Sequence, residues 1–214
     1  MSEGIRYDLA YETMPWDDVD TVVFDIGNVL IRYAPDNFVK TLFPGDEAAQ
    51  QHMLDHVYRG AHWLQFDRGV LSYDEAAAML EREHGRPKEE YLRALRGWME
   101  LKEPLEEGWR AARLCKEKGK RIVLLSNYPK EGYEFLRKKF ASRFDLFDDA
   151  CISCYIHQIK PEEPIYRTLM ADCGVQAGRA VFIDDLLANV EGAMNVGIHG
   201  FHMHETGMMD RFFR

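Results

Sequence analysis

The sequence predicts an α/β protein with a doubly wound, mostly parallel sheet and an α-helical cap inserted after the first strand. Short runs of β-branched and aromatic residues recur along the chain, and segments with helical periodicity separate them. A long block between the first run and Pro104 shows helical periodicity and almost no strand signal. Because strands that alternate with helices form parallel sheets through right-handed crossovers, the runs should share one sheet.

Four short apolar runs are the predicted strands. They are residues 21–25, 121–126, 150–153 and 179–184. The first run ends at an acid and is followed by Gly27, as expected where a buried strand enters a turn. Four helices of the core are predicted over residues 105–118, 130–140, 162–173 and 188–196. Gly119, Gly174 and Gly197 follow three of them, and glycine suits the left-handed residue that ends a helix.

The helical block is too long for a loop, so we expect a separate cap. Its clearest helical segments are residues 46–58, 73–84 and 89–101. We therefore expect a core domain of residues 1–34 and 103–214 and a helical cap domain of residues 35–102.

Composition excludes several classes of protein. With 214 residues, 46% of them hydrophobic and 29% charged, the chain is long enough for a core domain that carries an insertion. The formal net charge of -9 argues against a nucleic-acid partner, because phosphate backbones require clustered Lys and Arg. No apolar run approaches the ~18 residues of a membrane span, and residues 1–18 are acidic, unlike a secretory signal. We expect a cytoplasmic protein whose four cysteines stay reduced.

Polar side chains stand where the predicted strands end. These are Asp25, Ser126 and the pair Asp184 and Asp185. In open α/β sheets the ligand binds beyond the carboxyl ends of the strands, so these groups should meet there. A buried aspartate is costly unless it is used or neutralised. A turn acid is the structural alternative for Asp25.

The other polar motifs suit phosphate and metal binding. Ser126 and Asn127 could donate to phosphate oxygens, although both also occur as simple helix N-caps. Lys160, just before Pro161, could neutralise a nucleophile and phosphoryl oxygens. The adjacent carboxylates of Asp184 and Asp185 repel one another, and Mg²⁺ would relieve that repulsion.

The chain carries the motifs DxGxV, SN, KP and DD in this order. In combination they resemble the haloacid dehalogenase (HAD) superfamily, and the resemblance extends from Thr21 to about Phe201. The segments FDIGNVL and RGAHWLQFDRGVLSYDEAAAML are most similar to the helical-cap branch that includes sugar-1-phosphate phosphatases and the amino-terminal phosphatase domain of soluble epoxide hydrolase. The resemblance implies a Rossmann-like core and a Mg²⁺-dependent phosphatase that acts on a small phosphate monoester, a sugar phosphate or similar, through an aspartyl-phosphate.

The resemblance also implies residue roles. Asp25 would be the nucleophile, and Ser126, Asn127 and Lys160 would bind the phosphoryl oxygens. Mg²⁺ would be held by Asp25, the main-chain carbonyl of Gly27 and Asp185, with Asp184 nearby or acting through water. Asn189, one turn beyond the paired acids, would support the metal loop, or else be an ordinary helix residue.

One position departs from the family pattern. Most phosphatases of this superfamily carry a second aspartate, the general acid and base, where this chain has Gly27. General acid–base catalysis is worth about 10²- to 10⁴-fold. Either the substrate has a good leaving group, such as an anomeric, acyl or aryl phosphate, or a cap residue such as His62 or Asp67 supplies the proton.

Two alternatives stay open from the sequence. L-2-haloacid dehalogenases also lack the second aspartate but need no metal, which would leave the Asp184 and Asp185 pair unexplained. The other alternative is a phosphate-ligand-binding regulatory protein with negligible turnover.

Several cysteines and histidines are expected to have no catalytic role. Cys151 and Cys154 are expected to be buried apolar residues, and His199, His202 and His204 are expected to be ordinary histidines. The substrate and the oligomeric state are not predicted.

Overall fold

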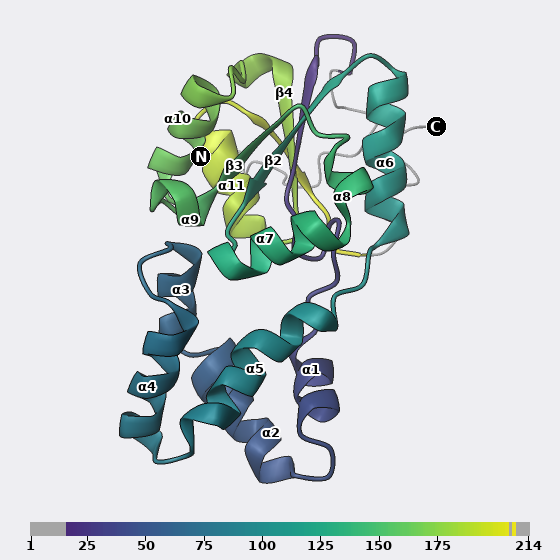
Figure 1. The fold of residues 1–214 in the computed structure, drawn as a ribbon. Coiled ribbons are helices and arrows are strands. Elements are labelled where there is room, and N and C mark those ends of the chain that lie inside the picture. Colours follow the sequence, from purple (N-terminus) through teal and green to yellow (C-terminus); the bar gives the residue numbers. More distant parts are fainter. Residues whose placement is uncertain (1–15, 206, 209–214) are drawn as a thin grey trace, which may run out of the picture.

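The computed structural model describes residues 16–205, 207 and 208, so the acidic start expected from the sequence lies mostly outside the described residues. Figure 1 shows an α/β lobe above a helical lobe, joined by two chain crossings. Among the described residues, no helix combines the length and the apolar character that a membrane span requires.

The upper lobe is built on a five-stranded, all-parallel sheet in the order β3-β2-β1-β4-β5. Its strands are β1 (Thr21–Phe24), β2 (Arg121–Ser126), β3 (Asp149–Ile152), β4 (Ala180–Asp184) and β5 (His199–His202). The predicted α/β class is confirmed. Ser153, predicted to end a strand, instead begins a short helix, and β5 was not among the predicted strands because its sequence HGFH carries little strand signal.

Helices cover both faces of this sheet. The core helices are α6 (Glu106–Glu117), α7 (Lys130–Lys139), α8 (Ala141–Phe144), α9 (Ser153–Ile156), α10 (Glu163–Asp172) and α11 (Leu187–Asn195), with a short 3₁₀ turn at Ala177–Arg179. Val22 and Phe24 of β1 pack with α6 residues, whereas Val23 packs with α10 and α11 residues. Alternate strand residues thus bury on opposite faces, as a doubly wound sheet requires.

The lower lobe is helical throughout. It contains α1 (Pro35–Leu42), α2 (Glu47–Met53), a π-helical segment (Leu54–Tyr58), α3 (His62–Asp67), α4 (Tyr73–His84) and α5 (Lys88–Glu100). The predicted helix 73–84 matches α4 at both ends, because Ser72 and Glu75 form a capping box and Gly85 ends the helix with a φ of 76°. The short helices α1 and α3 were not predicted.

The two lobes meet along a continuous apolar seam. One buried cluster runs from β1 and β2 into α1, α4 and α5. The two crossing segments are paired, since Arg32 N–H donates to the Glu103 carbonyl (2.9 Å) and Leu105 N–H donates to the Leu30 carbonyl (2.8 Å). The expected domain limits at residues 34 and 102 therefore fall beside paired crossing segments.

Candidate active site

Side chains from four separate segments meet at the carboxyl edge of the sheet. Asp25 follows β1, Ser126 ends β2, Asp184 ends β4 and Asp185 follows it. Parallel neighbours β2, β1 and β4 place these ends together, as the sequence predicts. Lys160 reaches the same edge from the loop that precedes α10.

Lys160 is the cation at the centre of this site. Its Nζ lies 2.7 Å from Asp25 Oδ1 and 2.7 Å from Asp184 Oδ2, and it donates to the Leu125 carbonyl at 3.1 Å. The side chain is only 1% exposed. Burial alone would lower the pKa of Lys160, but the neighbouring carboxylates of Asp184 and Asp25 raise it above its ordinary value, so the amine stays charged.

Asp25 is a buried carboxyl with a perturbed proton affinity. Burial raises the pKa of Asp25 to about 6, while the charge of Lys160 and a hydrogen bond from Ser126 act in the opposite direction. The negative charge of Asp184 adds to the rise. A positive ligand at this edge would therefore favour the ionised form of Asp25 that a nucleophile requires.

The acidic groups can accommodate a divalent metal ion. Carboxylate oxygens of Asp25, Asp184 and Asp185 lie within 4.8 Å of one another. Asp185 accepts a hydrogen bond from Asn28 Nδ2 (2.9 Å), and burial together with the charge of Asp25 raises the pKa of Asp185. Hard oxygen donors so close together fit Mg²⁺, and Gly27 borders the same cavity with no side chain in the way.

Asp184 is the most enclosed of the three acids. Its Oδ1 accepts from the Leu186 N–H (2.8 Å), and both of its oxygens accept from Asn189 Nδ2 at 3.0 and 3.1 Å. Together with the Lys160 contact, these bonds occupy the carboxylate. Asp184 is therefore better placed to orient Lys160 than to contact a metal directly, and Asn189 supports this loop.

Asn127 has a different local role from the one implied by the resemblance. Its side-chain amide donates to the Lys160 carbonyl (2.9 Å), and its Oδ1 accepts from the Lys160 N–H (2.8 Å). The side chain thus fixes the backbone that carries Lys160. Phosphate binding by Asn127 stays a prediction.

A cavity of about 460 Å³ opens onto these residues from the cap side. Much of its wall is aromatic, with the rings of Trp63 and Trp98 from the cap, Tyr33 from the crossing segment and Tyr128 from the loop after β2. Lys102 lies there with its Nζ 4.1 Å from the Trp98 ring centroid and 4.6 Å from that of Tyr33. Trp63 was one of several cap residues considered for the substrate entrance, whereas Tyr33, Trp98, Lys102 and Tyr128 were not predicted to line it, since helical periodicity gives no sign of which residues face the space between cap and core.

The two cap residues named as possible acids lie in different places. Asp67, the last residue of α3, lines this cavity and is 6% exposed. His62 instead has its Nε2 3.3 Å from Glu83 Oε2 and is not among the residues that line the cavity.

Several other histidines and cysteines were expected to have no catalytic role. His202 Nε2 lies 3.0 Å from the Asp185 carbonyl oxygen. The four cysteines are buried and free, as expected.

Comparison with known proteins identifies the family. A haloacid dehalogenase-like hydrolase model matches residues 19–197. The sesquiterpene phosphatase astK of Aspergillus oryzae is 26% identical over 184 residues, which cover 86% of this chain and 89% of that protein. The drimenol cyclase drtB of Aspergillus calidoustus is 22% identical over 196 residues, 90% of this chain but 35% of that protein.

Solved structures share the fold. A HAD family enzyme of Bacteroides thetaiotaomicron, in complex with magnesium and inorganic phosphate, superposes with a TM-score of 0.69 at 20% identity over 86% of this chain and 93% of that one. L-2-haloacid dehalogenase of Xanthobacter autotrophicus gives a TM-score of 0.63 at 18% identity over 86% of this chain and 77% of that one. Because the family model spans most of the sequence, this chain belongs to the haloacid dehalogenase-like hydrolases.

Proposed function

We propose that this protein is a Mg²⁺-dependent phosphatase that hydrolyses a small-molecule phosphate monoester through an aspartyl-phosphate at Asp25. The observation that carries the proposal is the contact of Lys160 with Asp25 beside Asp185 and Ser126. A carboxylate nucleophile, a fixed ammonium and a cluster of metal-binding oxygens are the groups that phosphoryl transfer needs.

Each residue has a defined task in this reaction. Asp25 attacks phosphorus, and the charge of Lys160 offsets negative charge on the nucleophile and on the phosphoryl oxygens. The Ser126 hydroxyl donates to the phosphoryl group once substrate displaces its contact with Asp25. When bound by Asp25, the Gly27 carbonyl and Asp185, Mg²⁺ would supply further positive charge against the phosphoryl oxygens.

The cavity indicates the organic part of the substrate. Aromatic rings form much of its wall, and Leu64 and Leu186, which are 54% and 57% exposed, add apolar surface to the lining. The hydroxyls of Tyr33 and Tyr128 are buried without hydrogen-bond partners among the described residues. This wall suits an ester with an apolar or aryl body and a few polar groups, consistent with the similarity to a sesquiterpene phosphatase. Among small phosphate esters, we therefore rank isoprenoid and aryl phosphates above the sugar phosphates suggested by the sequence.

The two other functions are less well supported. Likeness to L-2-haloacid dehalogenase at 18% identity shows the fold alone. Dehalogenation would leave the three clustered carboxylates without a purpose, since an uncompensated acidic cluster is a cost to folding. A regulatory protein that only binds phosphate would not need the Asp25 carboxylate 2.7 Å from Lys160, because a carboxylate at that position repels a phosphate anion.

The first prediction tests the function directly. We expect the protein to release phosphate from p-nitrophenyl phosphate with Mg²⁺, and to lose activity when EDTA is added. Asp25→Asn should lower kcat by at least about 10³-fold, because an amide cannot form the phospho-enzyme.

Three controls accompany this measurement. Isoprenoid, aryl and sugar phosphates are compared by kcat/KM, and L-2-chloropropionate is offered without metal. Chloride release that depends on Asp25 would support the dehalogenase alternative. Phosphate binding in calorimetry without any turnover would support the regulatory one.

A further inference from the structure

The turn after Asp25 supplies no acid to protonate the leaving group. Gly27 lines the cavity, and a Cβ added to it would meet only Asp25 Oδ2, at an ordinary 3.7 Å. Gly27 is not among the glycines with a left-handed φ, so its backbone conformation does not demand glycine, and the space around it does not demand glycine either. If the proposed phosphatase reaction is correct, its proton donor must come from another element.

Asp67 has the surroundings of such a donor. The residue is 6% exposed, and its Oδ1 is buried without a hydrogen-bond partner among the described residues. It shares the cavity with Asp25, Lys160 and Asp185. Burial raises the pKa of Asp67 to about 7, and the nearby charge of Asp25 adds to the rise while Lys160 opposes it. A buried carboxyl oxygen without a hydrogen-bond partner is costly, which indicates a use for it.

The core holds this cap residue in place. Ser153 Oγ donates to the Asp67 carbonyl (2.5 Å) and accepts from the Tyr128 N–H (2.9 Å). The next residue, Arg68, is also fixed, because its carbonyl lies 2.7 Å from His157 Nδ1 and its side chain pairs with Glu162. The end of α3 is thus bound to the loop that leads to Lys160.

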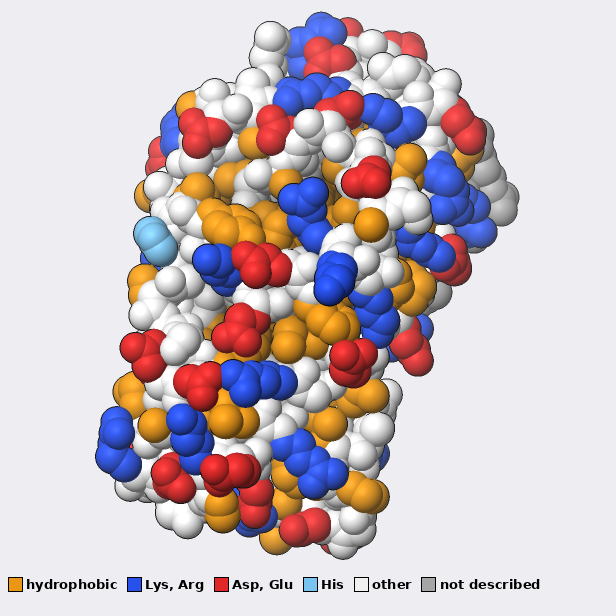
Figure 2. Space-filling model, in the orientation of Figure 1, with side chains coloured by type: hydrophobic (Ala, Val, Ile, Leu, Met, Phe, Trp, Pro, Cys, Tyr) orange, Lys and Arg blue, Asp and Glu red, His pale blue; other side chains and the backbone are white. Residues whose placement is uncertain are grey.

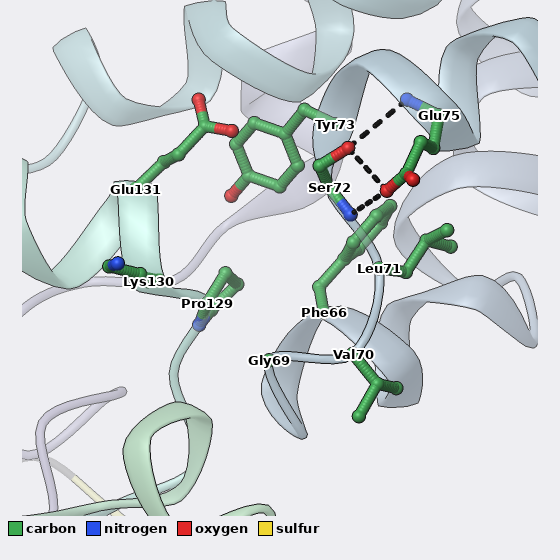
Figure 3. Close-up of a pocket in the computed structure, with 10 residues that line it drawn as sticks. All are labelled: Phe66, Gly69, Val70, Leu71, Ser72, Tyr73, Glu75, Pro129, Lys130 and Glu131. Carbon is green, nitrogen blue, oxygen red and sulfur yellow. Dashed lines mark hydrogen bonds between the residues drawn. The ribbon is translucent and has the colours of Figure 1, made fainter.

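The chain around Gly69 strengthens this attachment. Gly69 has a φ of 67° and lies so close to the core that an added Cβ would be 2.2 Å from the Cys154 carbonyl oxygen. Figure 3 shows a second, smaller cavity beyond it, where residues 69–72 lie opposite residues 129–131. Asp67 thus lines the larger cavity and Gly69 the smaller one, and the close contact of Gly69 with Cys154 lies between the cap and the core.

We propose that Asp67 is the general acid and base of the phosphatase reaction, supplied by the cap in place of the missing acid at Gly27. As Asp25 bonds to phosphorus and the ester P–O bond breaks, the Asp67 carboxyl donates its proton to the leaving oxygen. The resulting carboxylate then takes a proton from water. That water attacks phosphorus, the bond to Asp25 breaks, and phosphate and the starting enzyme are regenerated.

The second prediction compares leaving groups. In Asp67→Asn, kcat/KM for phenyl phosphate should fall by about 10²- to 10⁴-fold. For p-nitrophenyl phosphate, kcat/KM should change less than about 10-fold, because that leaving group needs little protonation. The kcat for p-nitrophenyl phosphate should still fall, because hydrolysis of the phospho-enzyme has lost its base. A burst of p-nitrophenolate should then precede steady-state turnover. Asp67→Ala, which buries no polar atom, is measured beside it in case the amide folds poorly.

The decisive variant moves the acid to the other position. In Gly27→Asp/Asp67→Asn, kcat/KM for phenyl phosphate should recover at least about 10-fold over Asp67→Asn alone. Equal loss on both esters in folded Asp67 variants, or no loss, would overturn the role of Asp67 while leaving the phosphatase proposal intact. If the parent protein releases no phosphate from either ester, the proposed function itself fails.

Discussion

At the scale of single residues, Lys102 is buried among aromatic rings with no hydrogen bond or ion pair to another described residue at its Nζ. The residue is 4% exposed, and burial holds the pKa of Lys102 well below its ordinary value. Contacts with the rings of Tyr33, Phe38 and Trp98 offset part of the desolvation cost. In the absence of a ligand, this amine should destabilise the folded protein.

The third prediction follows from that burial. We expect Lys102→Met to raise the free energy of unfolding at pH 7 by about 1–3 kcal/mol, because an apolar chain of similar length avoids burial of the amine. The folded pKa lies below the unfolded one, so the penalty is complete at low pH and disappears as pH approaches roughly 10.5. Urea denaturation at several pH values measures this. Lys40→Met, at an exposed position on α1, should show no such gain.

Residues with a fixed place on the sheet could be predicted from the sequence. Asp25, Ser126 and Asp185 each stand beside the end of an apolar run, and parallel topology then brings them together. Lys102 could not be predicted, because its burial depends on how the cap closes. The hydrogen bonds between Asn127 and Lys160 likewise depend on two loops 33 residues apart.

At the scale of elements, the end of α3 joins the cap to the core. Asp67 reaches the catalytic edge only while residues 67–69 lie against α9. The Ser153 hydroxyl, which donates to the Asp67 carbonyl, and the close packing of Gly69 on the Cys154 backbone hold them there. A displacement of about 1 Å in a catalytic group can cost about 10²-fold in rate. The activity should therefore respond to changes in this contact more strongly than the overall stability does.

The fourth prediction separates backbone strain from displacement of the cap. Gly69→Ala adds a Cβ at 2.2 Å from the Cys154 carbonyl oxygen, which must push segment 67–69 away from the core. We expect kcat/KM for phenyl phosphate to fall by about 10-fold or more. Gly85→Ala is the matched control, since its φ of 76° is equally left-handed but nothing lies within 4 Å of the added Cβ.

Thermal unfolding completes this comparison. Both alanine variants should lose about 1–2 kcal/mol from the left-handed backbone. Only Gly69→Ala should lose activity beyond what its stability explains. An equal loss of activity in Gly85→Ala would show that cap stability, and not the position of Asp67, limits the reaction.

Element prediction succeeded where the ends of an element carry local signals. α4 has a capping box at Ser72 and a left-handed Gly85, and its limits were predicted to the residue. α3 has six residues and no side-chain cap, and Leu54–Tyr58 is π-helical. α3 is stabilised by packing against its neighbours and carries little periodicity of its own, so the sequence alone could not place it. The predicted helical segment 46–58 covers α2 and this π-helical segment, but the change of helix type was not predicted.

At the scale of the whole molecule, an acidic protein concentrates three carboxylates at one edge of its sheet. The chain carries a formal net charge of -9, and on the face shown in Figure 2 acidic and basic side chains are interspersed, so no broad positive surface compensates the cluster there. Lys160 neutralises only part of it. The remaining repulsion links the stability of the fold to the cation that the site would bind.

The fifth prediction is that Mg²⁺ stabilises the protein more at pH 7.5 than at pH 5. The pKa of Asp25 is raised from 3.8 to about 6, so the native state holds its proton more tightly than the unfolded state does. Metal-free protein should therefore lose stability as pH rises through that window, while Mg²⁺ binds the ionised carboxylates and offsets the loss. At about 100 times its Kd, the ion would contribute about 2.7 kcal/mol.

Asp185→Asn provides the matching variant. It removes one of the repelling charges, so the metal-free Tm should rise at pH 7.5 and the shift with Mg²⁺ should largely disappear. Glu117→Gln, which removes one charge at an exposed position on α6, should keep the full shift. Thermal unfolding with Mg²⁺ or EDTA at the two pH values measures all of these. A Mg²⁺ shift of equal size in Asp185→Asn would mean that the ion stabilises the protein elsewhere, because the cluster would then lack one of the two clustered acids that line the cavity.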